Sequence, residues 1–324
     1  MTIARALLCS LAGVVFAAGF LDLAPAAGAR EVQVNCNGAP GAFKTLTAAL
    51  AALSPAGPNT VLVVGVCREN VVIQGFDRLT IQGNPFATIN GGSDPAADTF
   101  DILASHEVSV QNIRLAGGGL AAQCSLQSLC RFSHVSIQDS VGDGLFVGND
   151  AFAFLDLTTI KNNAADGLVL GSGGGATLAG STVQGNAGDG VAVAAGAKLT
   201  VGRDLETNTI VTVIQNNGGA GLRAGVHTGI ALHGPTVSGN GSDGVTVQGG
   251  SGAVLDSTSI TGNSGHGVRI GDLSFVSFIG TNSITGNAPS DITCDPAFSS
   301  TRGIAGPLGN GSTTNCPPEP PRNP

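Results

Sequence analysis

The sequence predicts an all-β fold, a parallel β-helix solenoid of about ten coils with an N-terminal capping helix. A triplet with an apolar middle residue and mostly polar flanks occurs nine times. The steps between its middle residues are 29, 27, 23, 23, 31, 23, 23 and 24, so the period settles near 23. A repeat of this length built from β-type units indicates coils that each bury an apolar face on the next. The middle residues are Ile81, Val110, Ile137, Ile160, Val183, Ile214, Val237, Ile260 and Ile284.

Composition agrees with this fold and excludes some functions. The chain has 324 residues with 50 Gly, 4% aromatic and 11% charged residues, which suits short strands joined by tight turns. Its formal net charge is −8, and it has no run of basic residues and neither Trp nor Tyr. A nucleic-acid groove needs a basic stripe with aromatic side chains for stacking. We therefore expect no nucleic-acid partner, and we expect a monomer.

Residues 1–29 are predicted to be an export signal. Arg5 supplies the positive start, residues 6–21 form the apolar stretch, and Ala27-Gly28-Ala29 is a small-residue cleavage pattern. The apolar run is shorter than the ~20 residues that a membrane span needs, which favours a cleaved signal over an anchor. No later segment is apolar enough to span a membrane. The expected location is extracellular, periplasmic or cell-surface.

Residues 30–58 are predicted to cap the first coil. Val32 and Val34 begin a strand, and residues 42–53 carry Phe43, Leu46, Leu50 and Leu53 at helical spacing. A solenoid needs such a cap because an open end exposes apolar side chains and strand edges. The solenoid itself is predicted over residues 59–293. Its first strands are expected over residues 60–67, 69–73 and 78–82.

One regular coil serves as a template for the others. Ile160 is expected to point inward while Thr159 and Lys161 point outward, because strand side chains alternate. Asn162-Asn163 and Asp166-Gly167 are expected to form turns, and Leu168 and Leu170 to point inward on a second strand. A loop over residues 173–175 then leads to a third strand that begins at Leu178.

Two residue types recur at fixed positions of the coil. A glycine precedes each second strand, which predicts a turn with positive φ. An asparagine recurs in the turn before it, which predicts a ladder of stacked amides. The glycines are Gly144, Gly167, Gly190, Gly221, Gly244 and Gly267, and the asparagines are Asn163, Asn186, Asn217, Asn240, Asn263 and Asn287.

Two departures from the repeat are expected at the surface and at the C-terminal end. The 31-residue step adds eight residues within residues 201–209, which predicts a projecting loop. Such an insertion is either part of a binding face or a neutral surface loop. Residues 294–316 are predicted to form a C-terminal end pinned by a disulfide. Residues 317–324, which hold five prolines, are predicted to be disordered.

Six of the seven cysteines remain after removal of the signal, which contains Cys9. An exported protein can keep disulfides, although six cysteines allow 15 connectivities. Proximity in the sequence favours neighbouring pairs, and no CxxC spacing indicates zinc or redox chemistry. The expected pairs are Cys36 with Cys67, Cys124 with Cys130, and Cys294 with Cys316.

Two segments near the N-terminus resemble the opening of pectin methylesterases. These are Phe43-Lys44-Thr45-Leu46 with the helix that follows, and the stretch Gly65-Val66-Cys67-Arg68-Glu69-Asn70-Val71-Val72-Ile73, in which Cys67 stands where the family has Tyr. The rest is similar to the general repeat of the pectin-lyase-like superfamily. The resemblance implies a right-handed parallel β-helix. It does not imply one activity, because this superfamily contains lyases, hydrolases, esterases, epimerases, adhesins and inert spikes.

The catalytic motifs of these relatives are not matched. Residues 140–149 have a faint likeness to the aspartate segment of pectin methylesterases, but the later Leu-Gly-Arg-Pro-Trp segment is absent. Residues 264–271 look similar to the Gly-His-Gly segment of polygalacturonases, without the aspartate pair of that family. His266 occupies a repeat position that holds Asp elsewhere, so the repeat explains both likenesses. The arginine and calcium motifs of pectate lyases are not visible.

The first candidate site is a column of aspartates. Asp143, Asp166 and Asp189 lie in successive coils, and Asp243 and His266 continue the column after Ala220. Stacked carboxylates within ~5–7 Å repel one another, and Ca²⁺ would relieve the repulsion. Ca²⁺ is the one cofactor that this column suggests, and we expect that the protein requires no cofactor. The alternative is that each aspartate caps its own turn by accepting backbone N–H bonds.

The second candidate site is a mixed acid–base region. Asp139, Asp143 and Lys161 are the candidate catalytic residues, because acidic-polysaccharide chemistry needs an acid–base pair and a cation for the uronate. The alternative is an ordinary solvated surface, and the lack of Trp and Tyr weighs against a sugar enzyme. The candidate substrate-binding residues are Arg114, Arg131, His134 and Gln138.

Three functions follow from these observations. The favoured one is a secreted or cell-surface scaffold that binds glycans or other components of the cell envelope. The alternative is a polysaccharide lyase or hydrolase. A further alternative is a binder of ice or crystalline polysaccharide, because the last three repeats present outward hydroxyl pairs. These pairs are Thr236/Ser238, Ser259/Thr261 and Ser283/Thr285, although Gln and Lys interrupt the columns in earlier coils. The sequence names no substrate.

Overall fold

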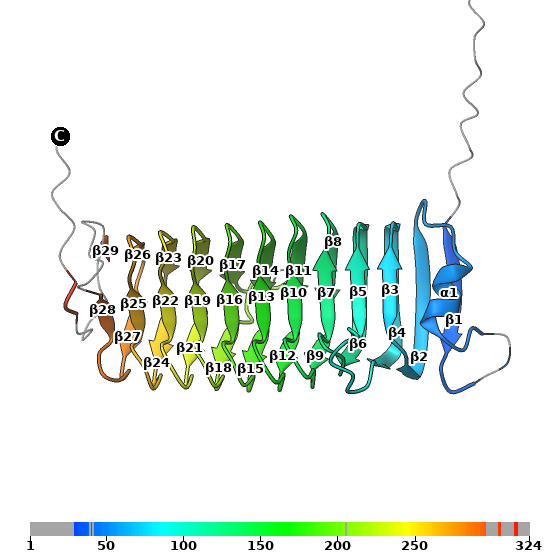
Figure 1. Cartoon of the computed structure of the whole chain (residues 1–324), viewed down its shortest axis with the longest axis horizontal. Coiled ribbons are helices and arrows are strands. Elements are labelled where there is room, and N and C mark those ends of the chain that lie inside the picture. Colours follow the sequence, from blue (N-terminus) through cyan, green and yellow to red (C-terminus); the bar gives the residue numbers. More distant parts are fainter. Residues whose placement is uncertain are drawn as a thin grey trace, which may run out of the picture.

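The computed structural model describes residues 29–38, 40, 42–204, 206–295, 304–305 and 314–316. The predicted signal apart from Ala29 and the proline-rich tail lie outside these residues. The described chain winds into a straight rod of about ten stacked coils, as predicted (Figure 1). The strands of the described residues all pair in parallel.

One side of the rod is a ten-stranded parallel sheet. Each of its strands comes from a different coil, so neighbours in the sheet are one repeat apart in sequence. Its strands are β3 (Val71–Gln74), β5 (Phe100–Leu103), β7 (Ala122–Ser125), β10 (Leu145–Val147), β13 (Leu168–Leu170), β16 (Val191–Val193), β19 (Leu222–Ala224), β22 (Val245–Val247), β25 (Val268–Ile270) and β28 (Ile292–Cys294).

The other nineteen strands form a sheet that bends into two faces. The long strands β2 (Asn59–Arg68), β4 (Asp77–Asn90) and β6 (His106–Ala116) run through both, and β1 (Arg30–Asn35) pairs with the start of β2. Face 1 contains β8 (Leu129–Ser133), β11 (Phe152–Asp156), β14 (Gly175–Ala179), β17 (Lys198–Gly202), β20 (Gly229–His233), β23 (Gly252–Asp256), β26 (Phe275–Ile279) and β29 (Ile304–Ala305). Face 2 contains β9 (Ser136–Gln138), β12 (Thr159–Lys161), β15 (Thr182–Gln184), β18 (Val213–Gln215), β21 (Thr236–Ser238), β24 (Ser259–Thr261) and β27 (Ser283–Thr285).

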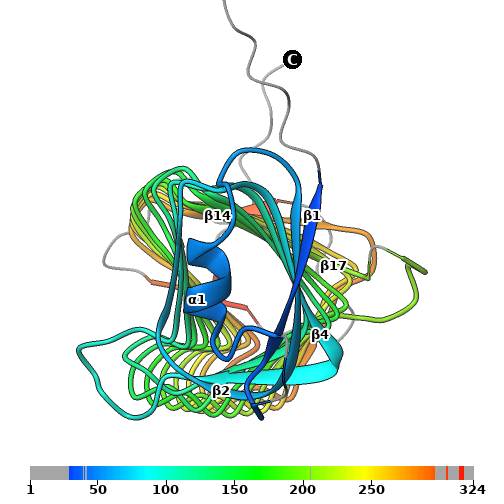
Figure 2. The same ribbon diagram turned by 90° about the vertical axis from the view of Figure 1, so that its right-hand side faces the viewer.

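The interior is filled by apolar residues that recur at the same register positions from coil to coil. Ile160, Leu168, Leu170 and Leu178 are all fully buried, which confirms the inward positions expected for the template coil. The third strand of that coil begins at Gly175, three residues earlier than predicted. Figure 2 looks along the rod and shows the coils superposed on one another.

The N-terminal cap is present, but its helix is shorter than predicted. Helix α1 (Leu46–Ala51) begins after Thr45, whose hydroxyl accepts the Ala48 N–H at 3.1 Å. The Glu69 carboxylate, one coil away, accepts the Leu46 N–H at 2.7 Å and so places the helix across the open end (Figure 2). Residues 42–45 are taken up by the turn that leads into the helix.

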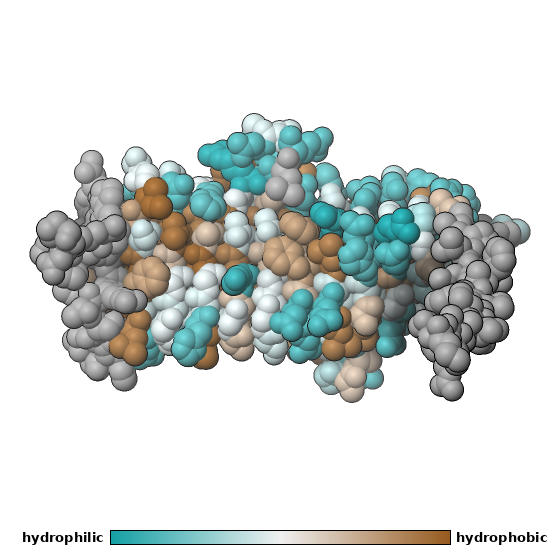
Figure 3. All heavy atoms as spheres, turned by 90° about the horizontal axis from the view of Figure 1, so that it is seen from above, coloured by the Kyte–Doolittle hydropathy of each residue, from teal (hydrophilic) through white to brown (hydrophobic). Residues whose placement is uncertain are grey.

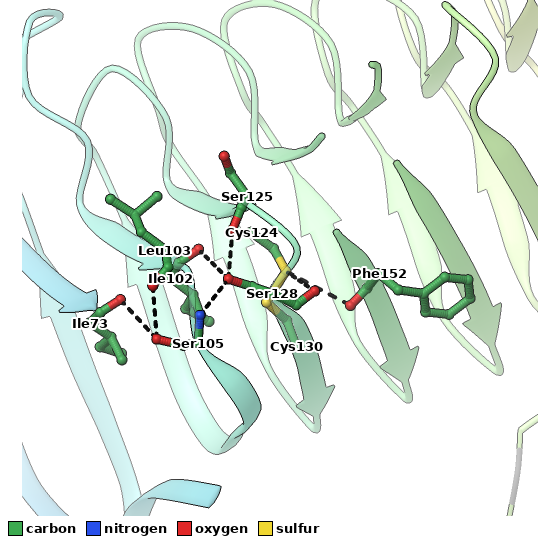
Figure 4. The surroundings of a disulfide bond; sticks show 9 residues. All are labelled: Ile73, Ile102, Leu103, Ser105, Cys124, Ser125, Ser128, Cys130 and Phe152. Carbon is green, nitrogen blue, oxygen red and sulfur yellow. Dashed lines mark hydrogen bonds between the residues drawn. A yellow bond between two sulfur atoms is a disulfide. The ribbon is translucent and has the colours of Figure 1, made fainter. Parts of the chain in front are cut away.

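Three disulfides hold the chain, with the three predicted pairings. Cys36–Cys67 ties the cap to β2, and Cys294–Cys316 ties β28 to the described C-terminal residues. Cys124–Cys130 closes the turn between β7 and β8. Figure 4 shows this bond beside Ser128, whose hydroxyl donates to Ser125 O at 2.6 Å and accepts the Ser105 N–H at 3.0 Å.

The predicted asparagine ladder runs through the turns between face 2 and the ten-stranded sheet. The Nδ2 of each amide donates to the Oδ1 of the next from Asn163 to Asn287, at 2.8–3.0 Å. Each Oδ1 from Asn186 to Asn287 also accepts the backbone N–H of the preceding ladder asparagine. The ladder ends on Asp291, whose carboxylate accepts from Asn287 at 3.2 Å.

The reason predicted for the repeated glycines is wrong. None of the six has a positive φ. The left-handed residue is the one before each ladder asparagine, such as Asn162 with φ 56° or Gly239 with φ 63°. The repeated glycines are needed for space: a Cβ at Gly221 would lie 2.5 Å from Val237 Cγ1 and 2.7 Å from Asn240 Nδ2.

The predicted insertion projects from the rod between β17 and β18 (Figures 2 and 3). Arg203 and Val211 form an antiparallel bridge at its base. Asp204 lies inside and accepts hydrogen bonds from the Thr207 N–H, the Thr207 hydroxyl and the Thr209 N–H, at 2.6–2.7 Å. These bonds give the described residues of the loop a defined shape.

Candidate functional site

The most developed group of polar side chains lies on the outer surface of the ten-stranded sheet. The middle residues of β19, β22 and β25 point outward because their neighbours, such as Leu222 and Val245, fill the interior. In-register pairing places Arg223, Thr246 and Arg269 in one column. Together with Asp243 and Gln248 they line an open groove of about 190 Å³.

Both arginines are held by carboxylates and remain about half exposed. Arg223 pairs with the almost buried Asp189, with Nε at 2.8 Å and Nη2 at 3.0 Å from its carboxylate oxygens. Arg269 pairs with Asp295 at 3.3 Å. Parallel strands lie ~4.8 Å apart, so the two arginines are separated by roughly 10 Å along the rod. A groove with two fixed guanidinium groups suits a ligand that carries repeated carboxylates.

Asp243 lines this groove, and His266 follows it at the same position of the next coil. Asp243 accepts the Thr246 hydroxyl at 2.9 Å and the His266 backbone N–H at 2.8 Å. The His266 ring contacts the Ser290 hydroxyl at 2.8 Å through Nδ1, which leaves Nε2 for other partners. The sequence analysis placed both residues in the aspartate column, and His266 also in the segment similar to polygalacturonases.

The aspartate column is a set of links between coils. Asp143 accepts the Asp166 N–H at 2.9 Å, Asp166 accepts the Asp189 N–H at 2.6 Å, and Asp189 accepts the Ala220 N–H at 2.7 Å. The prediction that each carboxylate caps its own turn is therefore wrong, because each one caps the turn of the following coil. Burial raises the pKa of Asp166; the Asp189 N–H opposes this, and the charges of Asp189 and Asp143 add to it.

The calcium site predicted at Asp143, Asp166 and Asp189 stays a prediction. In the described part of the chain, the one place where three potential metal-ligand atoms lie within 4.8 Å of one another is Cys36, Cys67 and Glu69. The two sulfurs there form a disulfide, and Glu69 caps α1. That group is therefore occupied by structural bonds.

The predicted catalytic residues Asp139, Asp143 and Lys161 lie around strand β9. Lys161 pairs in register with Gln138, whose amide donates to the Asp139 carboxylate. Asp139 has φ 59° and so takes the left-handed turn position of its coil. Asp143 lies at the far end of the same turn, in the aspartate column. The catalytic roles predicted for these three residues stay predictions.

The predicted substrate-binding residues are divided between the two faces. Arg114 lies on the part of β6 that pairs with β9, and Gln138 lies on β9, both on face 2. Arg131 lies on β8 of face 1, with its guanidinium 4.5 Å from the centre of the Phe154 ring. His134 lies in the turn between the faces, and its Nδ1 contacts the Ser133 hydroxyl at 3.0 Å.

The hydroxyl pairs on face 2 are in register over three coils. Thr236 pairs with Ser259 and Ser259 with Ser283, and the second column is Ser238, Thr261 and Thr285. In earlier coils the second column holds Gln184 and Gln215, which are hydrogen-bonded to each other at 2.9 Å. The regular hydroxyl array therefore covers the C-terminal part of the face.

Asp101 is a notable residue that the sequence analysis missed. Its Oδ1 is, among the described residues, the one buried side-chain polar atom without a hydrogen-bond partner. Burial, with a smaller effect of the Asp98 charge, raises the pKa of Asp101 to about 6. It points outward from β5, five strands from Arg223 in the same sheet. Only the alternation within β5 could have indicated it in the sequence.

The arginines of the groove had a sequence signal that was not used. The second-strand positions were interpreted only for their inward residues, and the residue between them is Arg223 in one coil and Arg269 in another. Alternation along a strand places that middle residue outside.

No helix among the described residues is both long and apolar enough to span a membrane.

Comparison with known proteins supports the fold. The sequence model of the family described as "Right handed beta helix region" matches residues 59–205. A pectate lyase structure aligns with a TM-score of 0.61 at 14% identity, over 81% of this chain and 79% of that chain. The A-module of a mannuronan C-5 epimerase from Azotobacter vinelandii aligns with a TM-score of 0.58 at 13% identity, over 86% and 95%.

A third solved structure is similar to the chain to about the same degree. An alginate lyase from Paenibacillus sp. str. FPU-7 aligns with a TM-score of 0.56 at 12% identity, over 86% of this chain and 98% of that chain. No curated protein shows significant sequence similarity to the chain. At these identities the likeness establishes architecture and leaves activity open. The chain therefore has the right-handed parallel β-helix fold of these structures.

Proposed function

We propose that this protein binds a polyuronate, an acidic polysaccharide, in the groove between Arg223 and Arg269. The observation that carries the proposal is the Arg223–Thr246–Arg269 column, which presents two fixed cations on either side of a hydroxyl. The two guanidinium groups, roughly 10 Å apart along the rod, suit a ligand that carries repeated carboxylates. The proteins named above act on pectate, mannuronan and alginate, all of them polyuronates.

The arginines are fixed in place before any ligand binds. The bidentate pair with Asp189 and the contact with Asp295 restrain side chains that are otherwise long and flexible. Restraint in the free protein lowers the entropy cost of binding. Because both guanidinium groups stay half exposed, each can still donate hydrogen bonds to a carboxylate of the ligand.

Titration calorimetry with polygalacturonate and alginate tests this proposal, with neutral dextran as the control polymer. We expect the double variant Arg223→Gln/Arg269→Gln to bind at least about 100-fold more weakly, since each hydrogen bond to a charged group contributes about 1.5–3 kcal/mol. Lys44→Gln, an exposed cation at the cap, is the matched control. Equal affinity for dextran, or an unchanged affinity of the double variant, would refute the proposal.

Such a scaffold would act outside the cytoplasm. The three disulfides favour an oxidising compartment, and the predicted signal gives the route. We infer that the protein is secreted or held at the cell surface, where it binds glycans of the envelope. Full-length protein found in the cytoplasm with its signal attached and its cysteines reduced would contradict this location.

A polysaccharide-cleaving activity is the second candidate. It is favoured by Asp243, an acid that lines the arginine groove, and by His266, whose backbone N–H Asp243 accepts. Incubation with polygalacturonate and alginate, with and without Ca²⁺, would reveal new unsaturated or reducing ends. Loss of these ends in His266→Ala would assign the chemistry to this groove, whereas loss in Asp139→Ala, Asp143→Ala or Lys161→Ala would assign it to the turn beside β9.

A further inference from the structure

A second groove lies on face 1, near the N-terminal end of the rod. Its volume is about 250 Å³, and its floor is a column of outward residues from four successive coils: Thr60, Thr80, Ser109 and Arg131. Pro58 and Glu107 stand on its side. Figure 3 looks onto this face and shows hydrophilic side chains gathered over the first coils, with a more apolar surface farther along.

Arg131 is the cation of this groove that is free for a ligand. Its guanidinium stacks on the Phe154 ring at 4.5 Å, which fixes its plane and leaves its N–H edges unused. Within the described chain no carboxylate lies within ion-pair distance of Arg131, whereas Arg78 beside it is paired with Asp77 at 3.0 Å. Three hydroxyls in line with an unpaired guanidinium suit a saccharide that carries a carboxylate.

The two grooves lie on different sides of a rigid rod. Arg131 projects from face 1 and Arg223 from the ten-stranded sheet, so a ligand bound at one is turned away from the other. The coil of Arg131 also contains β7, which is four strands from β19 and six from β25. At ~4.8 Å per strand, the grooves are offset by roughly 20–30 Å along the axis.

We propose that the groove at Arg131 is a second site for acidic saccharides, and that the protein uses both grooves to cross-link polyuronate chains. This inference rests on the proposed function of the Arg223–Arg269 groove. Two sites on one rigid body that face different directions cannot easily bind adjacent stretches of one stiff polymer. Binding at the second site is therefore expected to recruit another chain, which gives a network rather than a tighter one-to-one complex.

Light scattering of protein titrated with polygalacturonate tests the cross-linking, and calorimetry with a short oligouronate counts the sites. The wild type is expected to bind about two oligomers per molecule and to form particles that grow and then dissolve with excess polymer. Arg131→Gln is expected to bind about one oligomer and to form no network. Arg131→Lys, which keeps the charge, is expected to recover part of the network.

Lys198→Gln is the matched control, since Lys198 is an exposed cation on face 1 outside both grooves. It should cross-link like the wild type, and thermal melting should show that all variants are folded. A wild type that binds polymer without forming a network, or an Arg131→Gln variant that cross-links normally, would overturn this inference and leave the first groove intact. Absence of any binding by the wild type would refute the proposed function itself.

Discussion

Asp101 combines burial, an unpaired oxygen and a nearby like charge, and all three favour its protonated form. In the unfolded chain its pKa is near 3.8, and in the folded protein it is raised to about 6. The folded state therefore holds a proton that the unfolded state has lost in the window between these values. Stability from this group is fully present below pH 3.8 and is lost as the pH rises through 6.

Asp101→Asn should remove this pH dependence, because the amide stays neutral at every pH. We expect the free energy of unfolding of the variant to exceed that of the wild type by about 1–2 kcal/mol at pH 7.5 and by little at pH 4. The gain is smaller than the full pKa shift implies because the Asp101 carboxyl is partly exposed to solvent. Urea unfolding at the two pH values measures the difference. The outcome against this account is an equal difference between variant and wild type at both pH values.

The repeated glycines show a second constraint at the residue scale, which is steric. Gly221→Ala would place its Cβ 2.5 Å from Val237 Cγ1 and 2.7 Å from Gly244 O, so coils must move apart. We expect a loss of about 1–3 kcal/mol of unfolding free energy. Gly229→Ala, which has no atom within 4 Å of its new Cβ, is the control and should be close to neutral. Similar midpoints for both variants in urea would show that the coils can relax.

At the scale of structural elements, the asparagine ladder joins successive coils through buried turns. Asn217 accepts the Asn186 N–H at 3.1 Å and the Asn186 Nδ2 at 2.9 Å, and it donates to Asn240 at 3.0 Å. Asn217→Ala leaves these buried groups unpaired and should cost about 2–4 kcal/mol. Asn216→Gly is the neighbouring control, since Asn216 is exposed with φ 54° and glycine accepts that conformation. The melting temperatures of the two variants should differ clearly. Equal losses of stability would show that the ladder does not stabilise the stacking of the coils.

The projecting loop depends on one carboxylate. The Thr207 hydroxyl and the backbone N–H groups of Thr207, Ile210 and Thr209 hold the pKa of Asp204 well below its usual range. The depressed pKa means that this stabilisation is present at neutral pH and is lost in strong acid. Asp204→Ala should loosen the loop and speed trypsin cleavage after Arg203 several-fold at pH 8. Glu206→Ala, an exposed acid in the same loop, should leave the cleavage rate unchanged; an Asp204→Ala loop as resistant as the wild type would argue against this role.

At the scale of the whole molecule, net charge and local charge oppose each other. The chain has a formal net charge of −8 and a sequence pI near 4.9, while the two grooves present arginine side chains. Long-range repulsion from a polyanion falls when the pH approaches the pI, although uronate groups remain ionised there. We therefore expect polygalacturonate binding to tighten between pH 7.5 and pH 5.5 at constant ionic strength, as measured by calorimetry. Weaker binding at pH 5.5 would indicate that titrating groups, and not the arginines, make the contact.

The sequence by itself determined the solenoid, its coil length, its cap, its disulfide pairs and its asparagine ladder. Each of these follows from a short repeat or from residues that are close together in the sequence, because a coil contacts only the coils before and after it. Ile160 and Asn163 could be placed in this way without any coordinates. The position of the projecting loop followed from the same counting.

Only the tertiary structure decided which polar residues share a surface and why the repeated glycines are required. Arg223 and Arg269 are 46 positions apart in the sequence but two strands apart in the sheet, and Arg131 turned out to lie on another face from Gln138. The glycines are needed because a ladder amide of the next coil lies against them, which no local turn preference reveals. Sites and close contacts arise between coils, at angles fixed by the turns, and a linear period does not encode those angles.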